Sequence, residues 1–420
     1  MTEHVDANER WTDPQRVDSY IQELSEFGAH GETGVARLVY SPEWVAAQDQ
    51  VATWMEESGL RVERDAVGNV WGYLDGRDRE QPMVVTGSHI DSQNPGGRFD
   101  GALGVVAGIA ALAALRQRHG QPDRTIAVVS LVEEEASRFP TANFWGSRAI
   151  VGRIAPEEPR RLRGYDGVTM AEAMRDAGLD PARIPEARRE DIGIFVELHI
   201  EQGPFLERED FPVGVVERIT GYRQLLVTLE GAANHAGTTP MDLRRDPMAG
   251  AAEIIGGVID TAHRMGRPCV TTVGRIVVSP NERAVIPRQV AFTVDARSPD
   301  PAQRETLLAR HEALIHEVAQ RRGLSVTLRA DSDRLPVACD PDVVATISAA
   351  AAAGGIPAMT MTSGAVHDAM QLAEIAEIAM IFVRSQGGIS HSPEEFTSAA
   401  DAAAGTEVLA RAVHALAYRS

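Results

Sequence analysis

The stretch "PMVVTGSHIDSQNPGGRFDGALGVVAGIAALAAL", residues 82–115, contains the parts from which an α/β sheet is built. The Val-rich run at 82–87 predicts a buried strand, whereas the apolar run at 102–115 is too long for a strand and predicts a buried helix. Between them lies a glycine-rich loop with one histidine and two aspartates. In open α/β sheets, ligands bind at the carboxyl ends of strands, so this loop is a candidate site.

Three further runs repeat the pattern of a strand that leads into polar residues. We expect strands at 124–132, 192–198 and 378–384, and an acidic or histidine-bearing stretch accompanies each of them. Ala-rich helical patterns alternate with these runs. The alternation predicts a helix-covered mixed α/β sheet built from residues 1–213 and 331–420.

The middle of the chain, residues 214–330, has a different pattern. Its strand and helix runs follow the order βαββαβ, which is typical of a compact ferredoxin-like α+β unit. We therefore predict a second domain inserted into the first. Its strands are expected at 224–231, 269–278, 289–297 and 324–330, and its helices near 246–265 and 301–322.

Composition excludes several classes of function. The chain has 41 Lys and Arg against 60 Asp and Glu, and a formal charge of −19 opposes binding to nucleic acids and anionic membranes. Its opening residues lack the apolar core of a secretory signal, and its longest apolar run is shorter than the ~20 residues that span a bilayer, so we expect a cytoplasmic protein. With only two cysteines, a metal site would need His, Asp and Glu ligands.

Five of the twelve histidines lie beside glycine, acidic or hydroxyl residues in loop-like contexts. These candidates for chemistry are His89, His199, His235, His367 and His391. The other seven lie in the N-terminal tail or on polar helical stretches, and we expect them to be exposed. They are His4, His30, His119, His263, His311, His316 and His414.

The loop at 87–104 has two interpretations. Asp100 is suited to be the N-cap of a helix that starts at Gly101, because aspartate is a favoured cap. The functional interpretation makes His89 and Asp100 metal ligands, with Asp91 orienting the imidazole of His89 from behind. The glycines would let the backbone fold closely around an ion.

The acidic stretch "LVEEEASRF" at 131–139 also has two interpretations. It suits a solvated turn, yet three adjacent carboxylates repel one another and call for a nearby cation. Neighbouring Glu side chains at a strand end diverge, so one can bind a metal while the next faces water, as a metallohydrolase requires.

Two more segments supply histidines. "ELHIEQGPFLE" at 197–207 places His199 close to Glu201 and Gln202. "GGISHSPEEF" at 387–396 places His391 before Ser392, Pro393 and Glu395, a spacing that predicts a helix-capping box. The capping box explains the serine and the glutamate but gives no role to His391.

These motifs, taken in order, resemble the hydantoinase/carbamoylase family of amidohydrolases, relatives of dinuclear-metal aminoacylases and aminopeptidases. The resemblance extends from "TGVARLVYSPEW" (33–44) to "HSPEEF" (391–396). The shared motifs are "GSHIDSQNPGGRFDGALGVVAG", "EEEASRF", "HIEQGP", "ANHAGTTPMDLRRD", "VDAR" and "SGAVHDA".

The resemblance implies a dinuclear site with two divalent ions, zinc or manganese, with cobalt or nickel as alternatives. Asp100 would bridge the ions, His89 and His199 would complete one site, and Glu135 and His391 the other.

Further roles follow from the same resemblance. Glu134 matches the general base, and the inserted domain would be a lid that also forms a homodimer. On that lid His235 would reach an active site, in the family often the partner subunit's. The residues that match substrate-binding positions are Gln202, His235, Asn281, Arg297 and Gly364.

The resemblance implies hydrolysis of the ureido C–N bond of an N-carbamoyl-L-amino acid, a small-molecule substrate. Allantoate amidohydrolase and β-ureidopropionase are alternatives, a dipeptidase or aminoacylase is a more distant one, and a metal-binding scaffold protein is the non-enzyme reading. Ala136 and Val366 stand where the family usually has glycine. Neither is an implied ligand, so these departures bear on the shape of the pocket rather than on the chemistry.

Overall fold

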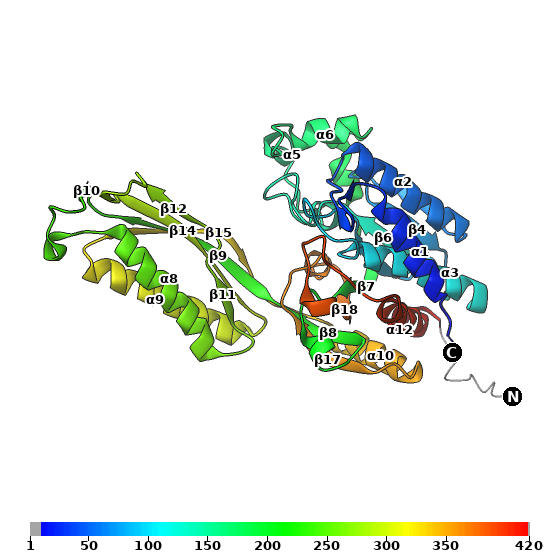
Figure 1. Ribbon diagram of the computed structural model, residues 1–420. Helices are drawn as coiled ribbons and strands as arrows, with labels where there is room; N and C mark the ends of the chain where they lie inside the picture. The colour runs from blue at the N-terminus through cyan, green and yellow to red at the C-terminus, as the bar shows by residue number, and fades with distance from the viewer. Residues whose placement is uncertain (1–9, 419–420) are drawn as a thin grey trace. The chain divides into compact units, whose positions relative to one another are not determined.

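The computed structural model describes residues 10–418, and within this range the chain forms two compact units (Figure 1). The first contains the residues up to Glu217, then Cys339–Met361, and the residues from His367 onward. The second contains Arg218–Ala338 and the short segment Thr362–Val366. The chain therefore crosses between units at 217/218, 338/339, 361/362 and 366/367, whereas we expected a single insertion with boundaries at 213/214 and 330/331.

A nine-stranded sheet organises the first unit. Its centre is parallel, with β5 flanked by β6 and β7, and β18 added next to β7. Antiparallel strands extend it on both sides, so the expected mixed sheet is confirmed. The strands in spatial order are β16 (Val337–Ala338), β8 (Val213–Ile219), β18 (Glu377–Val383), β7 (Ile192–Ile200), β5 (Met83–His89), β6 (Ile126–Leu131), β4 (Val70–Leu74) and β3 (Arg61–Arg64), with β17 (Ala358–Ser363) also paired to β8.

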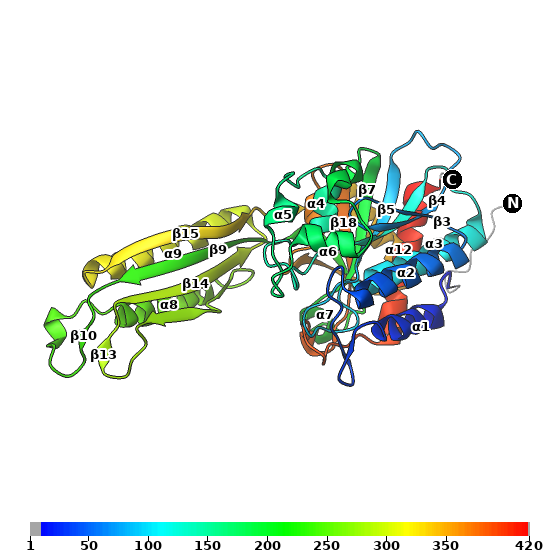
Figure 2. The same ribbon diagram turned by 90° about the horizontal axis from the view of Figure 1, so that it is seen from above.

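Helices cover both faces of this sheet (Figure 2). The apolar run after the glycine-rich loop forms α3 (Ala102–His119), in which every residue from 102 to 112 is buried. It packs on β5, β6 and β7 beside α12 (Ala399–Ala417). The other helices begin with Pro after an Asp or Ser cap in several cases, as expected from the fixed φ of proline. They include α1 (Pro14–Ser25), α2 (Pro42–Glu57), α4 (Trp145–Ile150), α5 (Glu158–Arg161), α6 (Met170–Asp176), α7 (Phe205–Arg208), α10 (Pro341–Ala353) and α11 (Ala369–Leu372).

The second unit has the expected βαββαβ order, with all its ladders antiparallel. Helices α8 and α9 pack on one face of its sheet (Figure 1). The strand expected at 269–278 is instead two short strands separated at 273–275, a segment that includes Gly274. The elements are β9 (Gly221–Glu230), α8 (Pro247–Met265), β11 (Val270–Thr272), β12 (Ile276–Ser279), β14 (Gln289–Ser298), α9 (Pro301–Arg321) and β15 (Ser325–Arg334), with a small ladder of β10 (Asn234–His235) and β13 (Val285–Ile286).

Buried and half-buried side chains alternate along β14, and this alternation distinguishes the two faces of the sheet. Val290, Phe292 and Val294 are fully buried against the helices, whereas the residues between them are half-buried. Because successive strand side chains point to opposite faces, the intervening residues lie on the face away from α8 and α9. This second face is therefore available for polar side chains.

One prediction about the histidines was wrong. His311 is fully buried, because it lies at helical spacing with Leu307, Leu308 and Ile315 on the inward stripe of α9. His30, His263 and His316 are exposed as expected, His119 and His414 are half-buried, and His4 lies outside the described residues. Among residues 10–418, no helix combines the length and the apolar character needed to cross a bilayer.

Candidate metal centre

The candidate site lies where parallel strands of the main sheet end. His89 is the last residue of β5, His199 is next to last in β7, and the acidic residues 133–135 follow β6. These three strands are neighbours and parallel, so their carboxyl ends converge at one edge. His391 reaches the same place from the loop that precedes α12, with a positive φ of 56°.

One carboxylate, that of Asp100, is shared by two groups of side chains that could each hold a metal ion. Its Oδ1 lies 3.1 Å from His199 Nε2 and 3.8 Å from His89 Nε2. Its Oδ2 lies 3.3 Å from His391 Nε2, which is itself 3.5 Å from Glu135 Oε2. Within each group the candidate ligand atoms all lie within 4.8 Å of one another. The structure thus brings together all five residues that the resemblance implies as ligands.

Backbone carbonyl groups orient the two imidazoles of β5 and β7. His89 Nδ1 lies 3.0 Å from the carbonyl oxygen of Asp91, and His199 Nδ1 lies 2.9 Å from that of Ile200. Both rings therefore turn Nε2 toward Asp100. The carboxylate of Asp91, expected to orient His89, is farther away, with Oδ1 at 3.7 Å, and its Oδ2 accepts a hydrogen bond from the amide of Glu135.

The interpretation of Asp100 as a helix cap is wrong. Helix α3 begins at Ala102, and its cap is Gly101, which offers no side chain. Gly101 has a φ of +63°, and a Cβ atom there would lie 2.4 Å from the imidazole of His89. Its amide donates to His199 Nε2 at 3.2 Å. The absence of a side chain at this position therefore lets the backbone pass between the two histidines.

The predicted capping box at Ser392 and Glu395 is also wrong, because the next helix, α12, begins only at Ala399 with Ser398 as its cap. Glu395 is instead buried beneath the site. Its Oε1 accepts hydrogen bonds from the amides of Phe99 at 2.9 Å and Asp100 at 3.0 Å. Its Oε2 accepts one from Ser390, whose hydroxyl group also contacts Asp100 Oδ2 at 3.1 Å.

The three consecutive glutamates are not a solvated turn. Glu133 is fully buried and accepts a hydrogen bond from the amide of Phe139. Glu134 has a side chain 11% exposed, with Oε2 3.8 Å from His89 Nε2. Glu135 lies on the His391 side, where Gln93 donates to its Oε2 at 2.7 Å. Ala136, a position at which the resemblance implies glycine, takes a φ of +53°, a conformation that glycine adopts without strain.

The electrostatics of this cluster fit a bound cation. Burial, followed by the charge of Asp100, raises the pKa of Glu135 to about 8. Burial opposes ionisation of Asp100 too, but hydrogen bonds to His199 and His391 hold its pKa well below the usual range. Asp91 Oδ1 and Glu135 Oε1 are buried without a hydrogen-bond partner. Crowded carboxylates with unpartnered oxygens and imidazoles as neighbours form a donor set that divalent zinc, manganese, cobalt or nickel accepts.

Gln202, expected among the substrate residues, contacts this cluster directly. Its Nε2 donates to Asp100 Oδ2 at 2.8 Å and to Ser390 Oγ at 3.2 Å, and it lies 3.3 Å from His391 Nε2. It approaches the same carboxylate oxygen of Asp100 as His391 does.

A second buried layer lies behind His199. Glu197, within β7, accepts hydrogen bonds from Ser88 at 2.8 Å and from the amide of Ala369 at 3.0 Å. His367, one of the five candidate histidines, packs edge-on against His199 with ring centroids 4.7 Å apart. Sequence reasoning missed Glu197, because it lies inside a strand rather than after one.

The remaining predicted site residues lie in the second unit. His235 is exposed, and its Nδ1 accepts hydrogen bonds from the amides of Gly237 at 3.0 Å and Thr238 at 3.3 Å. A neutral ring that accepts at Nδ1 carries its proton on Nε2. Asn281 is exposed with a φ of +62°.

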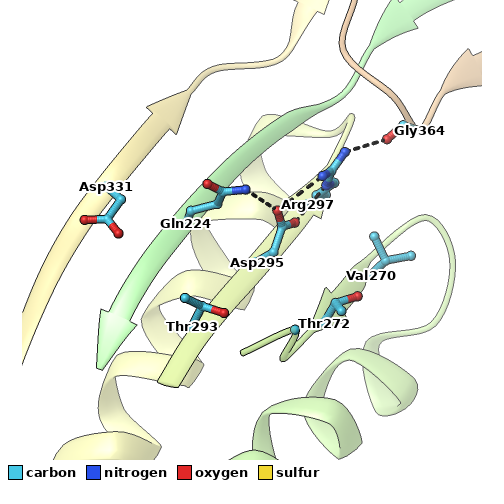
Figure 3. Close-up of a pocket in the computed structure, with 9 residues that line it drawn as sticks. Gln224, Val270, Thr272, Thr293, Asp295, Arg297, Asp331 and Gly364 are labelled. Atoms are coloured by element: carbon cyan, nitrogen blue, oxygen red, sulfur yellow. Dashed lines mark hydrogen bonds and ion pairs between the residues drawn. The ribbon is translucent and has the colours of Figure 1, made fainter. Parts of the chain in front are cut away.

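Arg297 and Gly364 line one cavity of about 520 Å³ on the face of the second unit's sheet that the helices leave uncovered (Figure 3). The carbonyl group of Gly364 accepts a hydrogen bond of 3.4 Å from Arg297 Nη1. Arg297 also pairs with Asp295, two residues earlier on β14, with Nε 2.7 Å from Oδ1. The cavity is lined by Gln224, Val270, Thr272, Gly274, Thr293, Asp295, Arg297, Asp331 and Gly364.

Comparisons with known proteins cover nearly the whole chain. The model of peptidase family M20/M25/M40 matches residues 85–415. An allantoate amidohydrolase of Bacillus subtilis (strain 168) is 39% identical over 402 residues, which is 96% of this chain and 97% of that protein. An N-carbamoyl-L-amino acid amidohydrolase of Geobacillus stearothermophilus is 41% identical over 405 residues, 96% and 98% of the two chains. A crystal structure of an amidase of the hydantoinase/carbamoylase family from Burkholderia multivorans superimposes with a TM-score of 0.88 at 35% identity, covering 97% of this chain and 98% of that one.

Proposed function

This chain belongs to the hydantoinase/carbamoylase amidohydrolases of peptidase family M20/M25/M40, and we propose that it hydrolyses N-carbamoyl-L-amino acids to the amino acid, ammonia and carbon dioxide. The observation that carries this proposal is Asp100, whose two carboxylate oxygens each face a separate group of candidate ligands. Allantoate is the second candidate substrate, because a relative of nearly equal identity is an allantoate amidohydrolase. Both compounds are ureido acids, so one site chemistry serves either.

We place two divalent ions at these groups, one held by His89, His199 and Asp100, and the other by Asp100, Glu135 and His391. Such a pair of ions lowers the pKa of water and polarises a carbonyl group. Zinc and manganese are the first candidates, with cobalt and nickel as alternatives, because mixed imidazole and carboxylate donors accept all four.

Glu134 would move the protons of the reaction. Its carboxylate lies on the His89 side of the cluster, where it would accept a proton from the water that attacks the ureido carbon. The same proton would then pass to the amino-acid nitrogen as the C–N bond breaks. The other product is carbamate, which decomposes to ammonia and carbon dioxide.

Residues of the second unit would bind the substrate. The planar guanidinium of Arg297 suits a carboxylate, for which it can provide two parallel hydrogen bonds. His235, with its proton on Nε2, would donate to the negative oxygen that forms on the attacked carbon. Gln202 and Asn281 are the further proposed substrate contacts.

The second unit's own geometry supports a homodimer in this proposal. Arg297 is paired with Tyr222 at the start of β9, whereas Gln289 is paired with Glu230 at its end. The short strand β10, which contains His235, lies beyond that end (Figure 2). Eight residues of strand span roughly 26 Å, which is much longer than an N-carbamoyl amino acid. Arg297 and His235 of the same subunit therefore cannot contact one substrate molecule. We propose that His235 acts in the site of the partner subunit, and that this unit is both the lid and the dimer interface.

A substrate panel tests the function. The protein would be purified, stripped with a chelator and reloaded separately with zinc, manganese, cobalt and nickel. Ammonia release would then be measured with N-carbamoyl-L-amino acids, N-carbamoyl-β-alanine and allantoate, and amine release with N-acetyl amino acids and dipeptides. We expect turnover of ureido acids only. Faster cleavage of dipeptides or N-acetyl amino acids would contradict the proposal.

The variant Glu134→Gln provides the matched control. It keeps the size and shape of the side chain but removes the base, so we expect kcat to fall roughly 10³-fold. Metal content should stay the same, because Glu134 is outside both proposed ligand groups. A variant with full activity would indicate a different base, or a protein that binds metal without catalysis.

A further inference from the structure

The cavity that contains Arg297 is built by the strand alternation of the second unit. On β14, Thr293, Asp295 and Arg297 are at alternate positions, and all three face away from the helices into the cavity (Figure 3). Neighbouring strands contribute Gln224 and Thr272, each of which is in register with Asp295. The charged pair on this strand therefore lies among hydroxyl and amide groups, with the apolar side chain of Val270 opposite Arg297 on β11.

Asp295 forms a bidentate ion pair with one edge of the Arg297 guanidinium. Nε lies 2.7 Å from Asp295 Oδ1, and Nη2 lies 3.2 Å from Oδ2, so both carboxylate oxygens are used. The pair is partly shielded, with side chains 31% exposed for Arg297 and 20% for Asp295. Two parallel contacts to a planar group fix its orientation as well as its position.

Gln224 holds Asp295 in turn. Its Nε2 donates to Asp295 Oδ2 at 3.0 Å from the adjacent strand β9, directly across the ladder. The guanidinium has two further neighbours: the ring centroid of Tyr222 lies 5.5 Å from Arg297 Cζ, and the carbonyl group of Gly364 accepts a hydrogen bond from Nη1. The guanidinium is thus fixed by a carboxylate, a ring and a carbonyl group.

The hydrogen-bond donors of Arg297 can be counted. A guanidinium has five N–H groups, one on Nε and two on each terminal nitrogen. The carboxylate of Asp295 accepts hydrogen bonds from the N–H of Nε and from one N–H of Nη2, and the carbonyl group of Gly364 accepts one from Nη1. What remains is one N–H on each terminal nitrogen, so each of these nitrogens still has a donor for a ligand carboxylate.

We propose that Asp295 and Gln224 are positioning residues for substrate recognition, which orient Arg297 so that its two remaining N–H groups bind the carboxylate of the ureido acid. This inference rests on the proposed function, in which Arg297 binds that carboxylate. Because Asp295 also compensates the positive charge of Arg297, recognition of the carboxylate depends on the orientation of the remaining N–H groups more than on net charge. In the alternative interpretation, Asp295 competes with the substrate carboxylate for the guanidinium, and the substrate must displace it.

The test compares a ureido acid with its carboxamide, for example N-carbamoyl-L-leucine and N-carbamoyl-L-leucinamide, in the metal-loaded full-length enzyme. For Asp295→Ala we expect KM for the acid to rise roughly tenfold, with kcat changed less than about twofold, because a contact equally strong in ground and transition states is weakened. KM for the carboxamide should not change. Gln224→Ala should raise KM for the acid by about two- to threefold, and Asp295→Asn should lie between wild type and Asp295→Ala.

The matched control is Glu230→Gln. Glu230 accepts a hydrogen bond from Gln289 across the same two strands, at the opposite end of the ladder from Arg297. The Glu230→Gln substitution removes one negative charge from the same sheet but leaves the contacts of Arg297 intact. Both kcat and KM should therefore stay at wild-type values. Circular dichroism and gel filtration of each variant would check that the fold and assembly are retained.

The outcomes separate the alternatives. A selective rise in KM for the acid supports positioning by Asp295. A fall in KM for the acid would establish competition by Asp295 and overturn the proposal, as would equal changes for the acid and the carboxamide. If the wild-type enzyme hydrolyses no ureido acid, the proposed function fails and this inference with it. An active wild-type enzyme with unaltered KM in Asp295→Ala refutes the inference alone.

Discussion

Substitution of Glu395 should weaken the candidate metal centre from beneath. Its carboxylate is 4% exposed and accepts hydrogen bonds from two buried amides, those of Phe99 and Asp100, and from the hydroxyl group of Ser390. In Glu395→Ala the two amides lose their acceptor, at a cost of about 1–3 kcal/mol for each. We therefore expect the free energy of unfolding of the first unit to fall by about 2–6 kcal/mol. Metal affinity should fall about 10- to 100-fold, since Asp100 loses its backbone support.

The variant Glu395→Gln separates hydrogen bonding from charge. A glutamine can keep one oxygen for the two amides and turn its NH₂ group toward Ser390 Oγ. We expect this variant to lose only about 1 kcal/mol and to retain most of its metal affinity. Urea unfolding followed by tryptophan fluorescence is the appropriate assay, because all five tryptophans, at positions 11, 44, 54, 71 and 145, lie in the first unit.

Metal affinity would be measured by competition with a chromophoric chelator, for wild type and both variants. Two results would refute the reasoning. The first is an alanine variant with wild-type stability and metal affinity, and the second is a glutamine variant as damaged as the alanine variant. The second result would mean that the charge of Glu395, rather than its acceptor oxygens, supports the site.

Three further predictions follow from particular residues. Gly101→Ala places a Cβ atom 2.4 Å from the His89 ring at a φ of +63°, so metal affinity, measured by chelator competition, should fall at least about tenfold. The control is Gly120→Ala, at a φ of +70° with nothing within 4 Å of the added Cβ atom. This control should cost about 1 kcal/mol of stability but leave metal affinity unchanged. Burial lowers the pKa of His311 to about 4 in the folded protein. As the pH falls, the unfolded state therefore takes up a proton on this histidine at a higher pH than the folded state does. This contribution to the stability of the second unit is complete above about pH 6.5 and is lost as the pH falls toward 4. Hydrogen exchange of α9 amides should show this loss, up to about 3 kcal/mol, and His311→Gln should flatten the slope; equal slopes would disprove the assignment to His311. Addition of zinc or manganese to the chelator-treated protein should raise its thermal unfolding midpoint and restore ureido-acid hydrolysis. Activity that survives complete removal of metal would contradict the dinuclear proposal.

The sequence by itself determined the elements and most of the candidate site. The apolar runs at 82–87 and 102–115 could form only a buried strand and a buried helix, because their length and periodicity leave no other way to remove them from water. Histidines and acids placed directly after strands were predictable as a cluster, because parallel strands end at one edge of a sheet.

The tertiary structure decided which atoms meet. Asp100 and Glu395 both had spacings suited to helix caps, and local sequence could not reveal that each instead serves a partner far along the chain. Glu395 is fixed by the amides of residues almost three hundred positions earlier, and His311 by the packing of α9. The pairing of Asp295 with Arg297 and Gln224 depends on strand register. Contacts of this kind are set by packing and register across the whole fold, whereas sequence patterns report only local periodicity and propensity.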